Sequence, residues 1–189
     1  MPAFNATLGS SAATSYIKVA QADEYYVGTL LESSWAALSD AEKEASLIAA
    51  TRGLETLTYN GTRCSPATDD ANLEQALQWP RSDVTCRGIT ATCVTLPQAI
   101  VDATASLALN MFTSPPTPGN PAGGATGAIK AQKLGELEQQ FYDVREGAST
   151  KVDASAPLIL QQWPYLVDLL ACWSDTATGS SRVILRVRS

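Results

Sequence analysis

The sequence contains no histidine, the side chain most often used for acid–base catalysis near neutral pH. No stretch of about 18 uncharged apolar residues occurs, so we expect no transmembrane helix. The first 15 residues lack the basic start and the apolar centre of a secretory signal peptide. We therefore expect a protein that is made in the cytoplasm and does not enter a membrane.

Charged residues are also scarce, at 17% of the 189 residues against about 25% in ordinary soluble proteins. Small residues such as alanine, serine and threonine take their place, which is typical of a subunit that its neighbours cover. The 13 Lys and Arg residues are outnumbered by 19 Asp and Glu residues. Because nucleic-acid affinity comes mainly from cations that replace counterions on phosphates, this balance argues against non-specific DNA binding.

The cysteines do not follow the spacing of a metal site. Cys64, Cys86, Cys93 and Cys172 include no CxxC pair, and no histidine can complete a zinc site. Cys86 and Cys93 are near enough in sequence to form a disulfide across a loop, which would remain open to test. In a reducing cytoplasm we expect free and mostly buried thiols instead. We expect no metal and no cofactor.

Hydrophobic periodicity predicts a mainly α fold, a small bundle of about four helices. The first helix is expected over 21–32, ending at Ser33-Ser34. Ser39 and Glu42 form a capping box that starts a second helix, which continues to about Leu57. Its buried stripe should comprise Leu47, Ala50, Leu54 and Leu57.

The next segments are less regular. We expect one helical turn over 73–78 and an irregular loop over 81–95 with three extended pieces. A third helix should begin at Pro97 and end near Phe112. A fourth helix is expected over 157–173, kinked or restarted at Pro164.

These elements divide the chain into four parts. Residues 1–15 read as a flexible N-terminal arm and 16–113 as the helical core, followed by a Pro/Gly-rich loop at 114–127. Residues 128–189 complete the same domain with a β element, the last helix and a terminal strand. Within 128–142 helix and strand are both compatible with the pattern, and we favour two strands around Gly135.

Several short motifs occur in a characteristic order, and each alone is weak. They are Ala22-Asp23-Glu24-Tyr25, Ala50 to Glu55, Tyr59-Asn60-Gly61, Gln75 to Arg81 with Trp79-Pro80-Arg81, Leu96 to Val101, and the segment from Leu158 to Arg188. In this order they resemble the small head–tail adaptor (head-completion, connector) proteins of tailed bacteriophages. Members of that family are often labelled primosomal-type single-stranded-DNA-binding proteins.

The resemblance implies a structural virion protein without catalytic activity. Such adaptors assemble in the host cytoplasm as a ring, usually of twelve copies, beneath the portal protein, and extended arms reach neighbouring subunits. Tail, nozzle or stopper proteins then attach, and the genomic DNA passes through the lumen without specific binding. Acidic residues such as Asp69, Asp70, Glu136, Glu138 and Asp143 would keep a lumen non-adhesive, although they are more simply solvated surface.

The terminal strand is the candidate contact with the portal or a neighbouring subunit. Its residues alternate between apolar Val183, Leu185 and Val187 and basic Arg182, Arg186 and Arg188. An unpaired edge of this kind can join a partner's sheet, or it can pair with 128–142 of its own subunit. For Trp79, Pro80 and Arg81 we favour a role in the fold over direct partner contact.

Other functions remain as alternatives. Single-stranded-DNA binding would use aromatic side chains for stacking, such as Tyr16, Tyr25, Tyr26, Trp35 and Tyr59, but only 182–188 is densely basic. An enzyme is not expected, since no histidine can activate a nucleophile. Another neck component, such as a stopper or tail terminator, would be richer in β structure.

Overall fold

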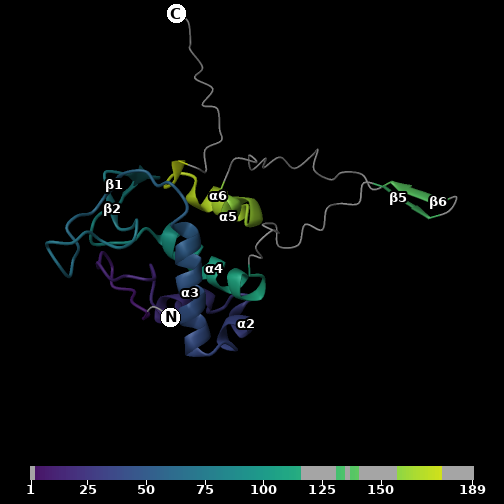
Figure 1. Cartoon of the computed structure of the whole chain (residues 1–189), viewed down its shortest axis with the longest axis horizontal. Helices are drawn as coiled ribbons and strands as arrows, with labels where there is room; N and C mark the ends of the chain where they lie inside the picture. Colours follow the sequence, from purple (N-terminus) through teal and green to yellow (C-terminus); the bar gives the residue numbers. More distant parts are fainter. Residues whose placement is uncertain (1–2, 116–130, 135–136, 141–156, 176–189) are drawn as a thin grey trace, which may run out of the picture.

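The computed structural model describes residues 3–115, 131–134, 137–140 and 157–175, and this part of the chain is mainly helical, as predicted (Figure 1). The helices are α1 (Val19–Tyr26), α2 (Glu32–Ala36), α3 (Asp40–Leu54), α4 (Gln98–Thr113), α5 (Leu158–Gln162) and α6 (Tyr165–Leu170). The strands are β1 (Thr62–Arg63), β2 (Arg81–Ser82), β3 (Thr85–Cys86), β4 (Ile89–Thr90), β5 (Ala131–Leu134) and β6 (Leu137–Gln140).

Helix α3 begins at the predicted capping box. The Glu42 backbone N–H donates to Ser39 Oγ at 3.4 Å, and the Ser39 backbone N–H donates to Glu42 Oε2 at 2.8 Å. These bonds satisfy backbone donors that the first helical turn leaves free. The predicted stripe of Leu47, Ala50, Leu54 and Leu57 is buried, although α3 ends at Leu54 and not near Leu57 as predicted, and α3 packs against α4.

Helices α5 and α6 close the core over α3 and α4. Pro164 is the N-terminal cap of α6, which confirms that this proline restarts the last helix. Gly53 lets α5 approach α3, because a Cβ atom there would lie 2.6 Å from Ile159 Cδ1 and 2.7 Å from Met111 Cε. Pro97 is the N-cap of α4, which begins at Gln98. We had expected Pro97 to be the first residue of the helix.

Two predicted helical segments differ from the structure, the first in its end and the second entirely. The helix expected over 21–32 ends at Tyr26, because Gly28 takes a left-handed conformation with φ of +74°. Ser33 and Ser34 lie inside α2 instead of ending a helix. Residues 73–78 form bends and no helical turn, since their backbone is held by contacts to other segments.

The strands form separate two-stranded antiparallel pairs, β1 with β2, β3 with β4, and β5 with β6. Three of them, β2, β3 and β4, are the extended pieces predicted within 81–95. Strands β5 and β6 pair in register from Ala131 with Gln140 to Leu134 with Leu137, which confirms strand over helix for this segment.

The cysteines form two disulfides, so the expectation of free thiols is wrong. Cys64 is joined to Cys93, and Cys86 to Cys172, each with Cα atoms 5.6 Å apart. The pair Cys86–Cys93, which looked plausible from its short spacing, does not form. Folding brings residues 86 positions apart into contact, and both bonds anchor the 81–95 loop to its surroundings.

Candidate functional site

The Trp-Pro-Arg signature lies inside the molecule. Trp79 is 1% exposed and packs edge-on against Tyr59 and Trp173, with ring centroids 5.6 and 5.8 Å away. Such T-shaped pairs add to the free energy gained from burial alone. The predicted role of Trp79 in the core is confirmed, and this residue is not available for a partner.

Arg81 holds the turn that ends the α3 region. Its Nε donates to the carbonyl oxygen of Asn60 at 2.8 Å, and its Nη2 donates to that of Gly61 at 2.6 Å. A longer bond of 3.4 Å reaches the Gln78 carbonyl. Burial of the guanidinium lowers the pKa of Arg81 from its ordinary value. The side chain therefore organises backbone carbonyls, as predicted, and does not face solvent.

Tyr16 joins the N-terminal segment to the signature. Its hydroxyl donates to the Glu55 carboxylate, which also accepts the backbone N–H of Gln78 at 2.9 Å. Burial raises the pKa of Tyr16 well above its usual value. The ring is 4% exposed, so it belongs to the core.

The segment 3–15, which composition predicted to be a flexible arm, lies against the loop around Asp69. The Asp69 carboxylate accepts the Ser10 hydroxyl at 2.7 Å and the Ser11 backbone N–H at 2.8 Å. These hydrogen bonds lower the pKa of Asp69 to about 2. The Thr68 N–H also donates to the Gly9 carbonyl at 3.0 Å. Asp69 is thus a structural clamp, where sequence suggested a solvated acid.

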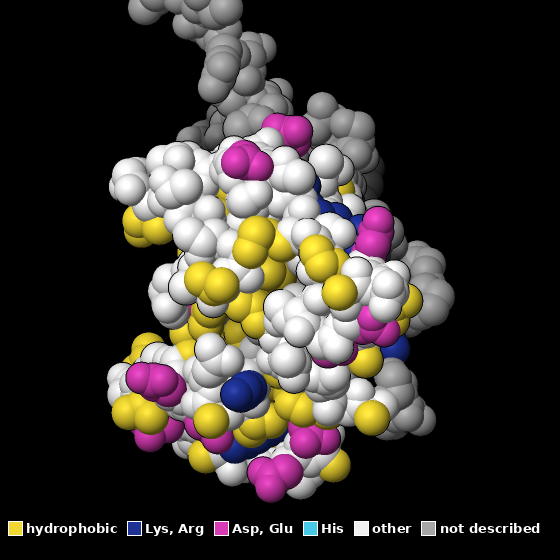
Figure 2. Space-filling model, turned by 90° about the vertical axis from the view of Figure 1, so that its left-hand side faces the viewer, with side chains coloured by type: hydrophobic (Ala, Val, Ile, Leu, Met, Phe, Trp, Pro, Cys, Tyr) yellow, Lys and Arg dark blue, Asp and Glu magenta, His cyan; other side chains and the backbone are white. Residues whose placement is uncertain are grey.

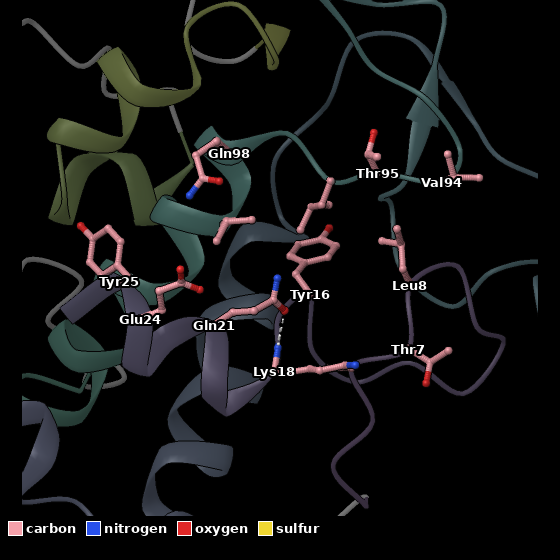
Figure 3. Close-up of a pocket in the computed structure, with 13 residues that line it drawn as sticks. Thr7, Leu8, Tyr16, Lys18, Gln21, Glu24, Tyr25, Val94, Thr95 and Gln98 are labelled. Atoms are coloured by element: carbon pink, nitrogen blue, oxygen red, sulfur yellow. Dashed lines mark hydrogen bonds between the residues drawn. The ribbon is translucent and has the colours of Figure 1, made fainter. Parts of the chain in front are cut away.

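The first cleft, the N-terminal cleft, lies between this segment and the start of α4 (Figure 3). It measures about 820 Å³ and is open and mixed in polarity. Lys18 and Glu24 on its walls have opposite charges, and Gln21 Oε1 accepts the backbone N–H of Lys18 at 3.0 Å. Leu8 and Val94 contribute to its apolar part, and both lie on the right-hand side of the view in Figure 3.

The second cleft, the α6 cleft, measures about 580 Å³ and is mainly apolar. The β3–β4 hairpin, the first turn of α4 and helix α6 form its walls, and the Cys86–Cys172 disulfide ties the hairpin to the end of α6. Its apolar lining includes Ile89, Pro97, Ala99, Leu169, Ala171 and Trp173. Arg87, Asp102 and Asp168 are the charged residues that line it.

A third feature is an apolar turn between α1 and α2, defined by Val27, Leu30 and Leu31. These side chains are 70%, 100% and 50% exposed, so all three aliphatic groups face water. Leu30 fits the apolar spacing of the preceding helix, so the sequence pattern places it on a buried face, and no local pattern marks Val27 and Leu31 as exposed.

The predicted partner-binding residues Arg182, Val183, Leu185, Arg186, Val187 and Arg188 lie outside the described residues. Within the described ranges no group of three or more His, Cys, Asp or Glu side chains could hold a metal ion. No helix in the same part of the chain is long and apolar enough to cross a membrane.

The family is decided by a match over nearly the whole chain. The family model described as "Putative DnaT-like ssDNA binding protein" matches residues 5–183. The chain belongs to this family. No curated protein and no solved structure matches it. The family description agrees with the single-stranded-DNA-binding label that accompanies the sequence resemblance.

In this member of the DnaT-like family, the aromatic side chains that the sequence offered for base stacking are largely inaccessible. Of the five that sequence offered for base stacking, Tyr16, Tyr26, Trp35 and Tyr59 are buried and Tyr25 is half-buried. Stacking requires an accessible ring face. The described body therefore presents none of the four buried rings to a nucleic acid.

The charge of the described residues also argues against a nucleic-acid interface. Residues 3–115 and 157–175 hold six of the 13 Lys and Arg residues but 14 of the 19 Asp and Glu residues. Lys43 pairs with Asp23 at 2.8 Å, and Arg81 is buried. The face in Figure 2 is largely uncharged, with scattered acids and few cations and no continuous basic track.

Proposed function

We propose that this protein is a structural virion subunit, a head–tail adaptor that forms a ring of about twelve copies beneath the portal. In this role it links the DNA-filled capsid to the tail and has no catalytic activity. The small helical bundle would be the ring body, and extended terminal arms would reach other subunits. The genomic DNA would pass through the lumen without specific binding.

The observation that carries the proposal is the apolar turn, in which Leu30 is fully exposed between Val27 and Leu31. Exposed aliphatic clusters on otherwise polar surfaces mark contacts with other macromolecules. The buried aromatic rings and the acidic body leave a protein partner as the better match for this surface than a nucleic acid. The sequence resemblance to adaptors supplies the identity of the partner.

The portal contact is assigned to Arg182–Arg188, from the sequence pattern alone. Its test is light scattering of the full-length protein with and without a portal complex. A ring-sized mass increase is expected, and deletion of 182–189 should abolish it. Replacing the exposed Arg52 by Gln provides a control that removes one cation elsewhere and should leave binding unchanged. Absence of any association with the portal at low and moderate salt would refute the adaptor role.

Single-stranded-DNA binding is the second candidate, favoured by the family description. Seven of the 13 Lys and Arg residues lie in 116–156 and 176–189. A basic track would therefore have to come mainly from these two parts of the chain. Fluorescence anisotropy with a labelled oligonucleotide tests this candidate directly. Tight binding that weakens steeply with salt would favour it over the adaptor, and no binding at micromolar protein would exclude it.

A further inference from the structure

The apolar turn is rigidly built, although its aliphatic side chains are exposed. The Gly28 N–H donates to Glu32 Oε2 at 2.9 Å, and the Thr29 N–H donates to the Tyr26 carbonyl at 3.0 Å. The Glu32 N–H in turn donates to the Thr29 carbonyl at 3.2 Å. The backbone of the turn therefore holds one shape without help from the side chains of Leu30 and Leu31.

The base of the turn is equally well fixed. The Tyr26 and Trp35 rings stack with centroids 5.0 Å apart, and both are buried. Trp35 Nε1 donates to Asp23 at 2.7 Å, and Lys43 lies 5.5 Å from the Trp35 ring centroid. A surface that is already ordered loses little conformational entropy on binding. Three aliphatic side chains therefore project into water from an ordered backbone, which lowers the entropy cost of burying them against a partner.

The same chain offers a receptor for this surface in the α6 cleft. The cleft is mainly apolar, and Ile89 at its rim is 63% exposed. In Figure 1 α2, which follows the apolar turn, lies at the lower end of the body, and α6 lies at the upper end. A projection at one end and a receptor at the other suit a head-to-tail contact between copies, which generates rings when the rotation closes.

The charges at the two surfaces are compatible with this contact. Residues 27–31 carry no charge, and Glu32 follows them, whereas Arg87, two residues before Ile89, is a cation in the cleft lining. Asp102 accepts a hydrogen bond from the Gln98 amide at 2.8 Å, and Asp168 lies on the α6 wall. Glu32 therefore matches the hairpin side of the cleft, where Arg87 lies, and would be repelled by the Asp102 and Asp168 side.

We propose that Val27, Leu30 and Leu31 of one copy bind in the α6 cleft of a second copy, forming the head-to-tail interface of the ring. This inference rests on the proposed function, because it names the contact through which the ring subunits would associate. It does not involve the portal surface, so the two proposals can fail separately. A ring-sized mass increase on the portal by a protein that stays monomeric on its own would overturn only this inference, because the portal would then recruit each copy separately.

The test uses sedimentation velocity of the full chain at protein concentrations up to about 1 mM, where even weak interfaces are populated. Leu30→Asp and Ile89→Asp should each weaken association by at least about tenfold, because each puts a charge into an apolar contact. Leu73→Asp is the matched control, since Leu73 is 50% exposed and lies on neither surface. Unchanged urea midpoints would show that the variants fold.

A mixture of Leu30→Asp and Ile89→Asp tests whether the contact between copies is head-to-tail. The cleft of Leu30→Asp and the turn of Ile89→Asp remain intact, so the mixture should form a one-to-one dimer that cannot grow. Failure of the mixture to associate would overturn the proposal. It would also be overturned by a wild-type protein that stays monomeric at 1 mM, or by an Ile89→Asp variant that assembles like the wild type. The last result would indicate a symmetric contact between two apolar turns.

Discussion

Removing the Cys86–Cys172 disulfide is expected to destabilise the protein more than removing Cys64–Cys93. A disulfide restricts the unfolded chain, and the restriction grows with the number of residues in the closed loop. For separations of 86 and 29 residues, the chain-entropy relation gives about 4.6 and about 3.6 kcal/mol respectively. Each bond has one buried cysteine, Cys86 or Cys64, but Cys172 is half-buried whereas Cys93 is exposed, so lost packing acts in the same direction.

The assay is urea unfolding followed by tryptophan fluorescence on two matched double variants, Cys86→Ala/Cys172→Ala and Cys64→Ala/Cys93→Ala. Both should unfold at lower urea than the oxidised wild type, with larger m values because the unfolded chain exposes more surface. Wild-type protein reduced with a phosphine provides a control that keeps every side chain. The reasoning is refuted if the variant that lacks Cys64–Cys93 is the less stable one, or if neither differs from the oxidised wild type.

Three further perturbations follow from single contacts. Arg81→Met should lower the unfolding free energy by about 2–4 kcal/mol, since carbonyls lose a charged donor, whereas Arg52→Met at an exposed site should cost less than about 0.5 kcal/mol in the same urea assay. Asp69 has a folded-state pKa of about 2, below the usual value of about 3.9, so its clamp should hold above pH 4 and be lost as the pH falls towards 2. Protease cleavage in segment 3–15 should therefore increase as the pH falls. Asp69→Asn should remove this pH dependence, and Asp70→Asn should not. Gly61→Ala should destabilise by more than about 1 kcal/mol in thermal unfolding, because φ is +80° and the new Cβ would lie 2.3 Å from the Ser82 carbonyl oxygen; an unchanged midpoint would contradict the close approach.

Local signals were sufficient where neighbouring residues determine the structure. Ser39 and Glu42 fix the start of α3 by bonds that they make to each other, and Pro164 restarts the last helix by its own geometry. The roles of Trp79 and Arg81 could also be predicted, because a large ring and a cation beside a proline favour the interior of a turn. For these two residues the residue type alone was informative, because the carbonyl partners of Arg81, Asn60 and Gly61, lie 21 and 20 positions away in the sequence.

The parts that sequence could not predict depend on distant residues or on exposure. Leu30 fits the helical spacing of the segment before it, yet it is fully exposed because the helix ends four residues earlier. The α6 cleft and the Cys86–Cys172 bond bring together segments 86 residues apart, and no local pattern encodes that contact. The composition of the N-terminal segment gave no sign of its packing, because Ser10 and Ser11 are held by Asp69, which is distant in the sequence.

The Cys86–Cys172 bond also determines how the protein would carry a mechanical load. Cys172 lies three residues before Asp175, so tension applied through the C-terminal residues reaches the disulfide before it reaches α6. The covalent bond passes that tension to the β3–β4 hairpin, and Cys93 passes part of it onward to Cys64. Pulling on the end of the chain would therefore load two covalent bonds anchored in the middle of the sequence, and would not peel the short helices α5 and α6 away one turn at a time.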